Sequence, residues 1–272
     1  MNSETPMALN QPFAPSLVQR KPEAKRVTAI ASGKGGVGKT WLAITLSHAL
    51  ARAGKHVLLF DGDLGLANVD IQLGLMPEQD LGGVIATGAD VGAAITHVDS
   101  TGFDVVAGKS GSGALSSLTR AEVSALRQGI LDLSPRYDQV IVDIGAGIDA
   151  TQLILASTGG AVLVVATDEP TSLTDAYAFI KVASRLTPKP DLRIVVNMAS
   201  SKAEGERTYA TLKRACESFL KFSPPLAGIV RRDNKVKDAI RYQTPFLTRH
   251  PNADAAADVE ALAAALVKAA PS

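Results

Sequence analysis

The chain has 272 residues, with 28 basic and 27 acidic side chains and a single cysteine, Cys216. A formal charge of +1 gives no protein-wide field for nucleic acid or an anionic membrane, so any such binding must be local. One cysteine excludes a disulfide framework or paired-cysteine metal site within the chain and fits a reducing cytoplasm. The sequence has no apolar run of about 18 residues and no signal-peptide core, so neither a membrane span nor secretion is expected.

The first 25 residues are rich in proline and polar residues and lack periodic apolar positions. This composition cannot build a core element, and it predicts a flexible arm over residues 1–25. No internal repeat or linker divides the remainder, so residues 26–272 are expected to form one domain.

A strand, a glycine-rich loop and a helix are predicted directly after the arm. Residues 26–31 form a short apolar run, and residues 40–53 carry leucines and alanines at helical spacing. Glycine backbone N–H groups can turn toward phosphate oxygens, a lysine can reach the β and γ phosphates, and a hydroxyl can ligate Mg²⁺. The intervening sequence meets all three requirements of a phosphate-binding loop: Gly33-Lys34-Gly35-Gly36-Val37-Gly38-Lys39-Thr40.

Lys34 is not required for binding the chain's own nucleotide. It lies on the entrance side of the loop, where it is badly placed for that nucleotide but could reach one bound by a facing subunit. The position therefore hints at a dimer, and the simpler interpretation is a solvated loop lysine.

Apolar runs alternate with helical stretches along the rest of the chain. Runs that are apolar throughout, rather than at alternate positions, indicate strands covered on both faces. The expected fold class is therefore α/β, with a mainly parallel β-sheet sandwiched by helices and ligands at the carboxyl ends of the strands. The further strand-like runs are 57–60, 103–107, 139–142, 161–167, 193–197 and 227–230.

Acidic side chains follow two of these strands. Asp61 and Asp63 come directly after residues 57–60, and Asp143 ends the strand at 139–142. Each acid could simply cap a turn. Beside a complete phosphate loop, however, Asp61 and Asp63 predict a site for metal and water, and Asp143 resembles the Walker B acid that supports Mg²⁺.

Together these motifs resemble the MinD/ParA-type ATPases, whose deviant phosphate loop reads Lys-Gly-Gly-x-Gly-Lys-Thr and whose fold is the P-loop NTPase fold of the SIMIBI, MinD-like class. Three strings are similar to the FlhG/FleN branch of flagellar number regulators: 63–70, 143–148 and 169–177. The resemblance implies a slow, Mg²⁺-dependent ATPase that forms a homodimer with ATP. Such an enzyme regulates the number and placement of polar flagella through partner proteins.

The resemblance also implies roles around the phosphates. Lys34 would contact the phosphates of the opposite subunit's ATP, as an arginine finger supplied in trans does. Lys39 and Thr40 would bind phosphate and Mg²⁺. Asp63 would position the attacking water, with Asp61 near the waters of the metal and Asp143 as the Walker B acid.

At the nucleoside end, Asn197 resembles the residue that recognises adenine, although an ordinary turn-forming asparagine is the simpler interpretation. Arg231 stands where relatives often have proline, and with Asp233 it would form the rim of the adenine pocket. Trp41 replaces a small polar residue that helps to hold the α-phosphate, leaving its backbone N–H for that contact. A tryptophan buried in the helix is the simpler interpretation.

The implied partners are a flagellar GTPase similar to FlhF, a transcriptional regulator or a polar landmark protein. Residues 11–20 lack the Asp-Gln-Ala-x-x-Leu-Arg segment that activates FlhF in many relatives. The C-terminal helix at 253–269 carries Asp254, Asp258 and Glu260 against Lys268, so it matches anionic lipid poorly and is expected to dock on the domain. The cytoplasm is the expected location, with polar or transient inner-membrane positions left open.

Two alternatives remain at this point. A ParA-like partitioning ATPase would bind DNA through a local basic cluster, with strong salt dependence. A nucleotide-binding scaffold would hydrolyse little ATP. The basic cluster comprises Arg231, Arg232, Lys235, Lys237 and Arg241.

Overall fold

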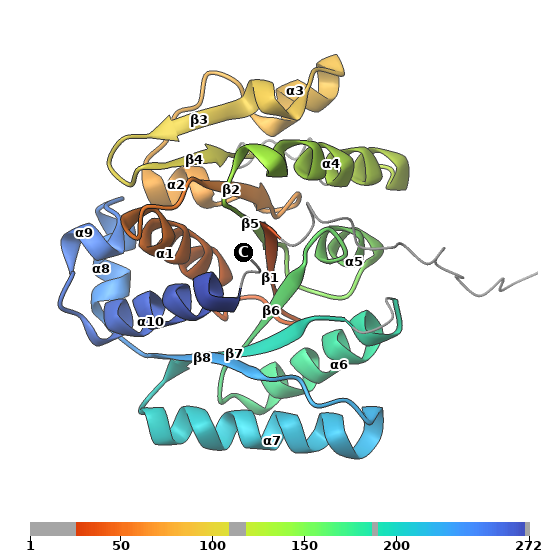
Figure 1. Cartoon of the computed structure of the whole chain (residues 1–272), viewed down its shortest axis with the longest axis vertical. Helices are drawn as coiled ribbons and strands as arrows, with labels where there is room; N and C mark the ends of the chain where they lie inside the picture. Colours follow the sequence, from red (N-terminus) through yellow and green to blue (C-terminus); the bar gives the residue numbers. More distant parts are fainter. Residues whose placement is uncertain (1–25, 109–117, 187–189, 270–272) are drawn as a thin grey trace, which may run out of the picture.

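The computed structural model describes residues 26–108, 118–186 and 190–269 (Figure 1). The arm predicted over residues 1–25 lies outside the described residues. Among the described residues, no helix has both the length and the apolar character needed to cross a membrane.

A single eight-stranded sheet in the order β3-β4-β2-β5-β1-β6-β7-β8 forms the centre of the described structure. Neighbouring strands are parallel except β3 and β4, so the prediction of a mainly parallel sheet is confirmed. The strands are β1 (Val27–Ala31), β2 (Val57–Gly62), β3 (Ile95–Val98), β4 (Phe103–Val106), β5 (Gln139–Ile144), β6 (Ala161–Ala166), β7 (Leu192–Ala199) and β8 (Leu226–Arg231).

Helices cover both faces of the sheet, as predicted (Figure 1). One face carries α3 (Leu81–Thr87), α4 (Arg120–Leu133), α5 (Ala150–Ala156), α6 (Pro170–Leu186) and α7 (Lys202–Leu220). The other carries α1 (Lys39–Arg52), α2 (Val69–Leu73), α8 (Lys235–Arg241), α9 (Phe246–Arg249) and α10 (Asp254–Ala269). Two short 3₁₀ helices, Val91–Ala94 and Ser134–Arg136, complete the described elements.

The two helix layers explain why the strands are apolar throughout. In β1, Val27, Ala29 and Ala31 pack into the core on one face, whereas Ile30 packs into the core on the other. Side chains alternate between the faces of a strand, so a strand buried on both sides is mostly apolar on both faces, as β1 is apart from the buried Thr28.

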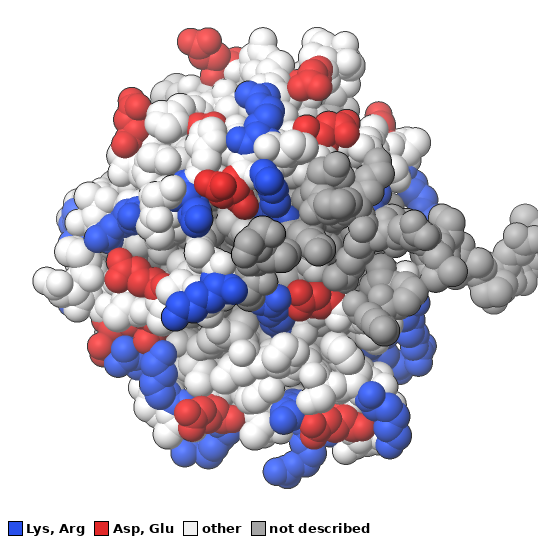
Figure 2. Space-filling view, in the orientation of Figure 1, with Lys and Arg blue, Asp and Glu red and all other residues white. Residues whose placement is uncertain are grey.

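The C-terminal helix α10 docks on the domain as expected. Val259, Leu262 and Leu266 are buried in the core that α10 shares with α1 and β8. Acidic and basic side chains are interspersed over the face shown in Figure 2, in keeping with the near-zero net charge.

Candidate functional site

The phosphate loop runs between the end of β1 and the start of α1, and neighbouring elements pack closely around it. A Cβ at Gly33 would lie 2.1 Å from the carbonyl oxygen of Asp175 in α6, so only glycine fits there. Gly38 has φ +85°, and a Cβ on it would lie 2.6 Å from Nδ2 of Asn197. Glycine is therefore required by contact at Gly33 and by both contact and backbone conformation at Gly38.

Lys39 begins α1 and is buried beside two of the predicted acids. Burial lowers the pKa of Lys39, whereas the charges of Asp143 and Asp63 raise it. The structure therefore brings the loop lysine and the acids that follow β2 and β5 into one electrostatic cluster.

Asp61 and Asp143 are paired residues on the adjacent parallel strands β2 and β5, and both are about 99% buried. Burial raises the pKa of each carboxyl, and the negative charge of Asp143 raises the pKa of Asp61 further. The neighbouring Thr40 side chain and the Lys39 charge act in the opposite direction on Asp143. Two desolvated acids beside a lysine form a site that favours added positive charge.

The carboxylate of Asp61 organises the loop that follows β2. Its Oδ1 accepts a hydrogen bond from the N–H of Asp63, and its Oδ2 accepts from the N–H groups of Asn68 and Val69, each at 3.2 Å. Asp63 is half-buried in this loop, and its Oδ1 accepts from the N–H of Leu66 at 3.1 Å. Asp61 thus holds the loop that carries Asp63. By accepting these N–H groups it also caps the turn, which is the simpler role that the sequence suggested for it.

Asp143 has both carboxylate oxygens buried, and within the described residues neither of them has a hydrogen-bond partner. Unpaired oxygens beside the Thr40 side chain fit a hydrated Mg²⁺ ion, which prefers oxygen ligands and usually retains several waters. The described residues contain no cluster of three His, Cys, Asp or Glu side chains that could hold a metal. Phosphate oxygens and water would therefore have to complete the coordination of Mg²⁺.

Lys34 does not extend freely into solvent. Its Nζ donates to Oε2 of Glu169 at 2.6 Å and to Oγ1 of Thr171 at 2.8 Å. This contact could not be predicted from the sequence, because it joins segments 135 residues apart.

Asn197 lies in β7, two residues before the strand ends, and its Nδ2 donates to the backbone carbonyl of Val37 at 2.8 Å within the protein interior. The next residue, Met198, has φ +57°, and its Cε lies 3.1 Å from the position of a Cβ on Gly38. The end of β7 therefore braces the phosphate loop, a contact not expected from the sequence.

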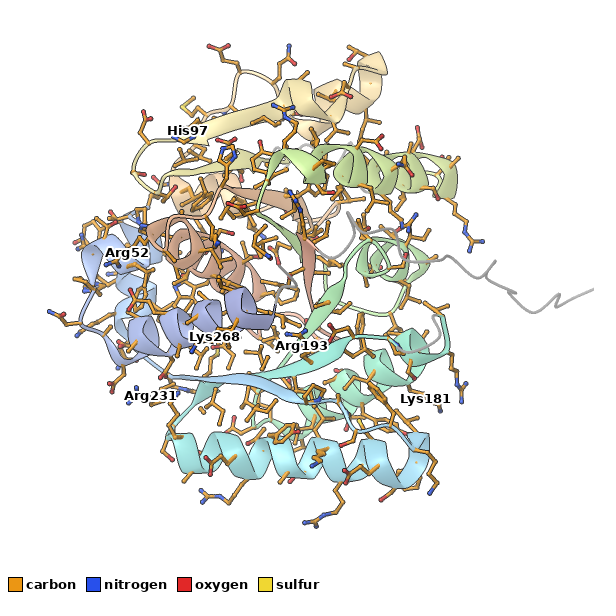
Figure 3. The ribbon with its side chains drawn as sticks, viewed as in Figure 1. Arg52, His97, Lys181, Arg193, Arg231 and Lys268 are labelled. Atoms are coloured by element: carbon orange, nitrogen blue, oxygen red, sulfur yellow. The ribbon has the colours of Figure 1, made fainter. Side chains whose placement is uncertain are left out.

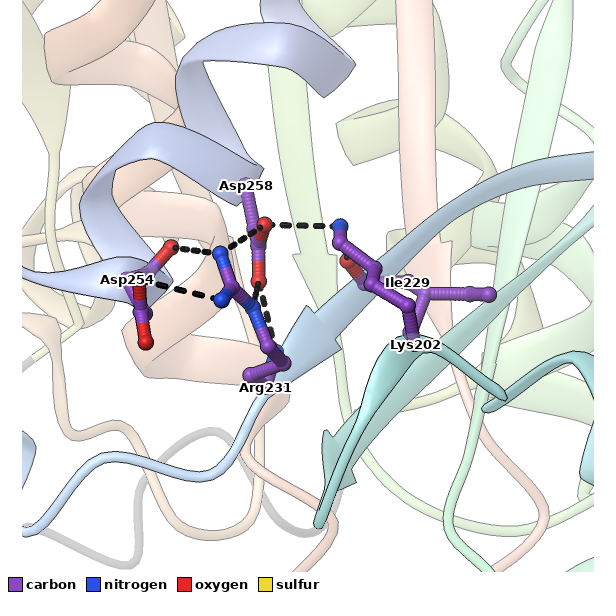
Figure 4. Close-up of polar contacts among 5 residues, drawn as sticks. All are labelled: Lys202, Ile229, Arg231, Asp254 and Asp258. Atoms are coloured by element: carbon purple, nitrogen blue, oxygen red, sulfur yellow. Dashed lines mark hydrogen bonds and ion pairs between the residues drawn. The ribbon is translucent and has the colours of Figure 1, made fainter. Parts of the chain in front are cut away.

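Arg231 is bound by the C-terminal helix (Figures 3 and 4). Its guanidinium pairs with Asp258 at 2.9 Å and with Asp254 at 3.0 Å, and Lys202 also pairs with Asp258 at 2.6 Å. These contacts tie β8 and the start of α7 to α10. Neither acid was predicted as a partner of Arg231.

The two remaining predicted residues have local contacts. Oδ1 of Asp233 accepts from the N–H of Lys235 at 2.9 Å. Trp41 is 93% buried, and its indole packs edge-on against Phe246, with ring centroids 5.2 Å apart. The Trp41 side chain thus belongs to the core, as its simpler interpretation held, and only its backbone is left for a nucleotide.

A strand, a phosphate loop and a helix, with buried acids at the ends of adjacent parallel strands, define a P-loop nucleotide-binding protein. Residues 28–246 match the profile of the CobQ/CobB/MinD/ParA nucleotide binding domain, so the chain belongs to this family. The resemblance to MinD/ParA-type ATPases is therefore confirmed, and ATPase activity in general is a property of such homologues.

Two relatives specify the branch. The chain is 35% identical over 238 residues to the antiactivator FleN of Pseudomonas aeruginosa, covering 88% of this chain and 85% of FleN. It is 31% identical over 245 residues to the flagellum site-determining protein YlxH of Helicobacter pylori, covering 88% and 81%. These relatives support the flagellar number regulator branch.

The fold also matches that of the septum site-determining protein MinD of Pyrococcus horikoshii, solved as a complex with Mg-ADP. The TM-score is 0.76 at 24% identity, covering 88% of this chain and 94% of that one.

Proposed function

We propose that this protein is an ATP-dependent dimerisation switch with slow, Mg²⁺-dependent hydrolysis, which regulates the number and placement of polar flagella through partner proteins. The observation that carries the proposal is the convergence of Lys39, Asp63 and Asp143 at one loop whose entrance carries a second lysine, Lys34. The relationship to FleN and YlxH supports the flagellar assignment.

In this proposal Lys39 binds the β and γ phosphates, and Thr40 and Asp143 hold Mg²⁺. When bound, Mg²⁺ would neutralise charge on the phosphates. The bound Mg-ADP in the Pyrococcus MinD supports this choice of cofactor. Asp63 positions the attacking water, and the three N–H groups bound by Asp61 keep its loop in place.

Lys34 of the facing subunit would supply positive charge to the phosphates as the reaction proceeds. Loss of a cation supplied in trans reduces the rate of related phosphoryl transfers by about 10³- to 10⁵-fold. Hydrolysis would then depend on dimerisation, and turnover would act as a timer that returns the protein to the monomer.

The partners in this proposal are a second copy of the chain and a flagellar GTPase, transcriptional regulator or polar landmark protein. The location is the cytoplasm and the cell pole.

Deletion of the gene followed by flagellar counting in the electron microscope tests the assignment: extra flagella at one pole are expected. Unchanged flagellation with missegregated DNA would instead favour the partitioning alternative.

The partitioning alternative depends on the basic cluster, but one member of that cluster is already paired with acidic side chains. Arg231 is committed to Asp258 and Asp254, whereas Arg232, Lys235, Lys237 and Arg241 are mostly exposed. Salt-sensitive retention on DNA that appears only with ATP would support this alternative. A scaffold without hydrolysis would show ATP binding and no phosphate release above a Lys39→Ala background.

A further inference from the structure

Two polar side chains lie beside Gly145, the residue that follows β5. The place that a Cβ on Gly145 would fill is 3.0 Å from Oδ1 of Asp63 and 3.4 Å from Nε2 of Gln152. Asp63 comes from the loop after β2, and Gln152 comes from the first turn of α5. Because both distances are measured to the same point, the carboxylate and the amide are neighbours over the backbone of Gly145.

Gln152 does not have the usual structural role of a glutamine at its position. It is the third residue of α5, after the N-cap residue Asp149, where a glutamine often accepts a hydrogen bond from the N–H of the N-cap residue. Instead, Oε1 of Gln152 is buried and accepts no hydrogen bond within the part of the chain that the structure describes. A buried acceptor without a donor destabilises a fold, so stability alone does not explain this side chain.

An attacking water molecule would supply the missing donor. Water has two O–H groups, and one acceptor for each of them leaves an oxygen lone pair directed at the atom that is attacked. Asp63 accepts one of these groups in the proposed function, and Oε1 of Gln152 is free to accept the other. Asp63 also belongs to the electrostatic cluster of Lys39 and Asp143, so such a water would lie beside the γ phosphate.

We propose that Gln152 is a second catalytic residue, which binds the attacking water together with Asp63 and directs its oxygen at the γ phosphorus. The proposal rests on the proposed function, in which ATP is hydrolysed at this loop. The water oxygen bonds to the γ phosphorus as the bond from that phosphorus to the bridging oxygen breaks. ADP leaves, and the proton that the water loses ends on the released phosphate. Gln152 itself neither gains nor loses a proton.

Steady-state ATP hydrolysis by the full chain with Mg²⁺ tests this role. Gln152→Met keeps the length of the side chain and removes its amide. The kcat should fall by about 10- to 100-fold, because a water that is no longer oriented reacts more slowly. The KM for ATP should change by less than about 2-fold, because the amide does not contact the nucleotide. A kcat within about 2-fold of the wild type would overturn the proposal.

The melting temperature separates a catalytic role from a structural one. Gln152→Met removes a buried acceptor that has no donor, so the nucleotide-free variant should melt at the wild-type temperature or above it. Gln152→Leu is a second replacement without polar atoms and should show the same two effects. A loss of kcat that comes with a lowered melting temperature in both variants would mean that the amide supports the fold, and the proposal would fail.

A matched control is available on α4. Gln128 is an exposed glutamine whose Nε2 donates to Oδ1 of Asp132 at 2.7 Å. Gln128→Met makes the same chemical change away from the phosphate loop and should leave kcat unchanged. If Gln128→Met lowers kcat as much as Gln152→Met does, the effect is not specific to the water site and the proposal is wrong.

A double variant shows whether Gln152 and Asp63 act on the same water. In an Asp63→Ala background the water has already lost its orientation, so Gln152→Met should lower the remaining rate by less than about 3-fold. A further loss as large as in the wild-type background would overturn the shared role. Wild-type kcat in Gln152→Met with slow hydrolysis in Asp63→Ala would refute this proposal alone. A wild-type protein that releases no more phosphate than Lys39→Ala would refute the proposed function as well.

Discussion

The side chain of Asn197 donates to the carbonyl of Val37 at 2.8 Å and so joins the end of β7 to the middle of the phosphate loop. The donor and acceptor are 160 residues apart in the chain and are buried. Loop conformation therefore depends on a residue whose sequence context suggested adenine recognition.

Replacing Asn197 by alanine should weaken binding of both ADP and inorganic pyrophosphate. The change leaves the Val37 carbonyl without its donor, at a cost of about 1–3 kcal/mol, and loosens the loop around the phosphates. Calorimetric titration of both ligands measures the effect, with the exposed Asn234→Ala as control. A loss confined to ADP would show that Asn197 contacts adenine and does not brace the loop.

Asp143→Asn should stabilise the nucleotide-free protein and abolish its stabilisation by ATP with Mg²⁺. Burial raises the pKa of Asp143, so the folded state binds a proton that the unfolded state releases, and stability falls as pH rises above the ordinary range of an aspartate. An uncharged amide removes this penalty, which we expect to raise stability by about 1–3 kcal/mol at pH 8. Thermal melts with and without ATP and Mg²⁺ measure both effects. A lowered melting temperature of the nucleotide-free variant would show that the buried Asp143 carboxylate does not destabilise the fold.

Asp258→Ala should destabilise the fold by about 2–4 kcal/mol. The Asp258 side chain is 4% exposed and receives both Arg231 and Lys202, and its removal leaves two cations without their shared partner (Figure 4). Glu260→Ala on the same helix is the control, because its pair with Arg52 is exposed and should contribute less than about 0.5 kcal/mol. Urea unfolding gives the free energy of unfolding of both variants. Equal losses would show that Asp258 does not tie β8 and α7 to α10.

His48 should make the protein less stable in mild acid. Burial, followed by the charge of Arg52, lowers the pKa of His48 to about 4. Between about pH 6.5 and pH 4 the unfolded chain binds a proton at this histidine and the folded state does not. The free energy of unfolding therefore falls as pH falls, by about 1–3 kcal/mol. His48→Leu should flatten this dependence in urea titrations at pH 7.5, 5.5 and 4.5. If the free energy of unfolding of His48→Leu depends on pH as it does in the wild type, His48 is not the cause of the loss of stability in acid.

The parts of the fold encoded by continuous local patterns were predictable. Apolar runs identified seven of the eight strands, and the apolar stripe of α10 indicated its docking. Strand β3 was missed because it lies at the sheet edge, where Ile95 and Thr96 are half-buried and His97 is exposed, so it lacks a continuous apolar run.

The sequence predicted which residues would gather at the site, but it did not predict several of their contacts. Motif spacing placed Lys39, Asp61 and Asp143 together because carboxyl ends of parallel strands meet at one edge. The partners of Lys34, Asn197 and Arg231 were not predictable, since each contact joins elements that only the tertiary fold brings together.

Mixing two inactive variants shows whether Lys34 acts on the nucleotide of the facing subunit. Lys34→Ala lacks the cation and Asp63→Ala lacks the water-positioning acid, so each alone should hydrolyse ATP slowly. In a mixed dimer, the Lys34→Ala subunit keeps its own Asp63 and receives Lys34 from its partner, which restores one site.

Equimolar mixing before ATP is added should therefore recover up to about a quarter of wild-type activity, because half of the dimers are mixed and each has one working site. If Lys34 served its own subunit, neither site of a mixed dimer would be complete. Phosphate release that stays equal to the average of the two separate variants would show that Lys34 does not act on the facing subunit's nucleotide.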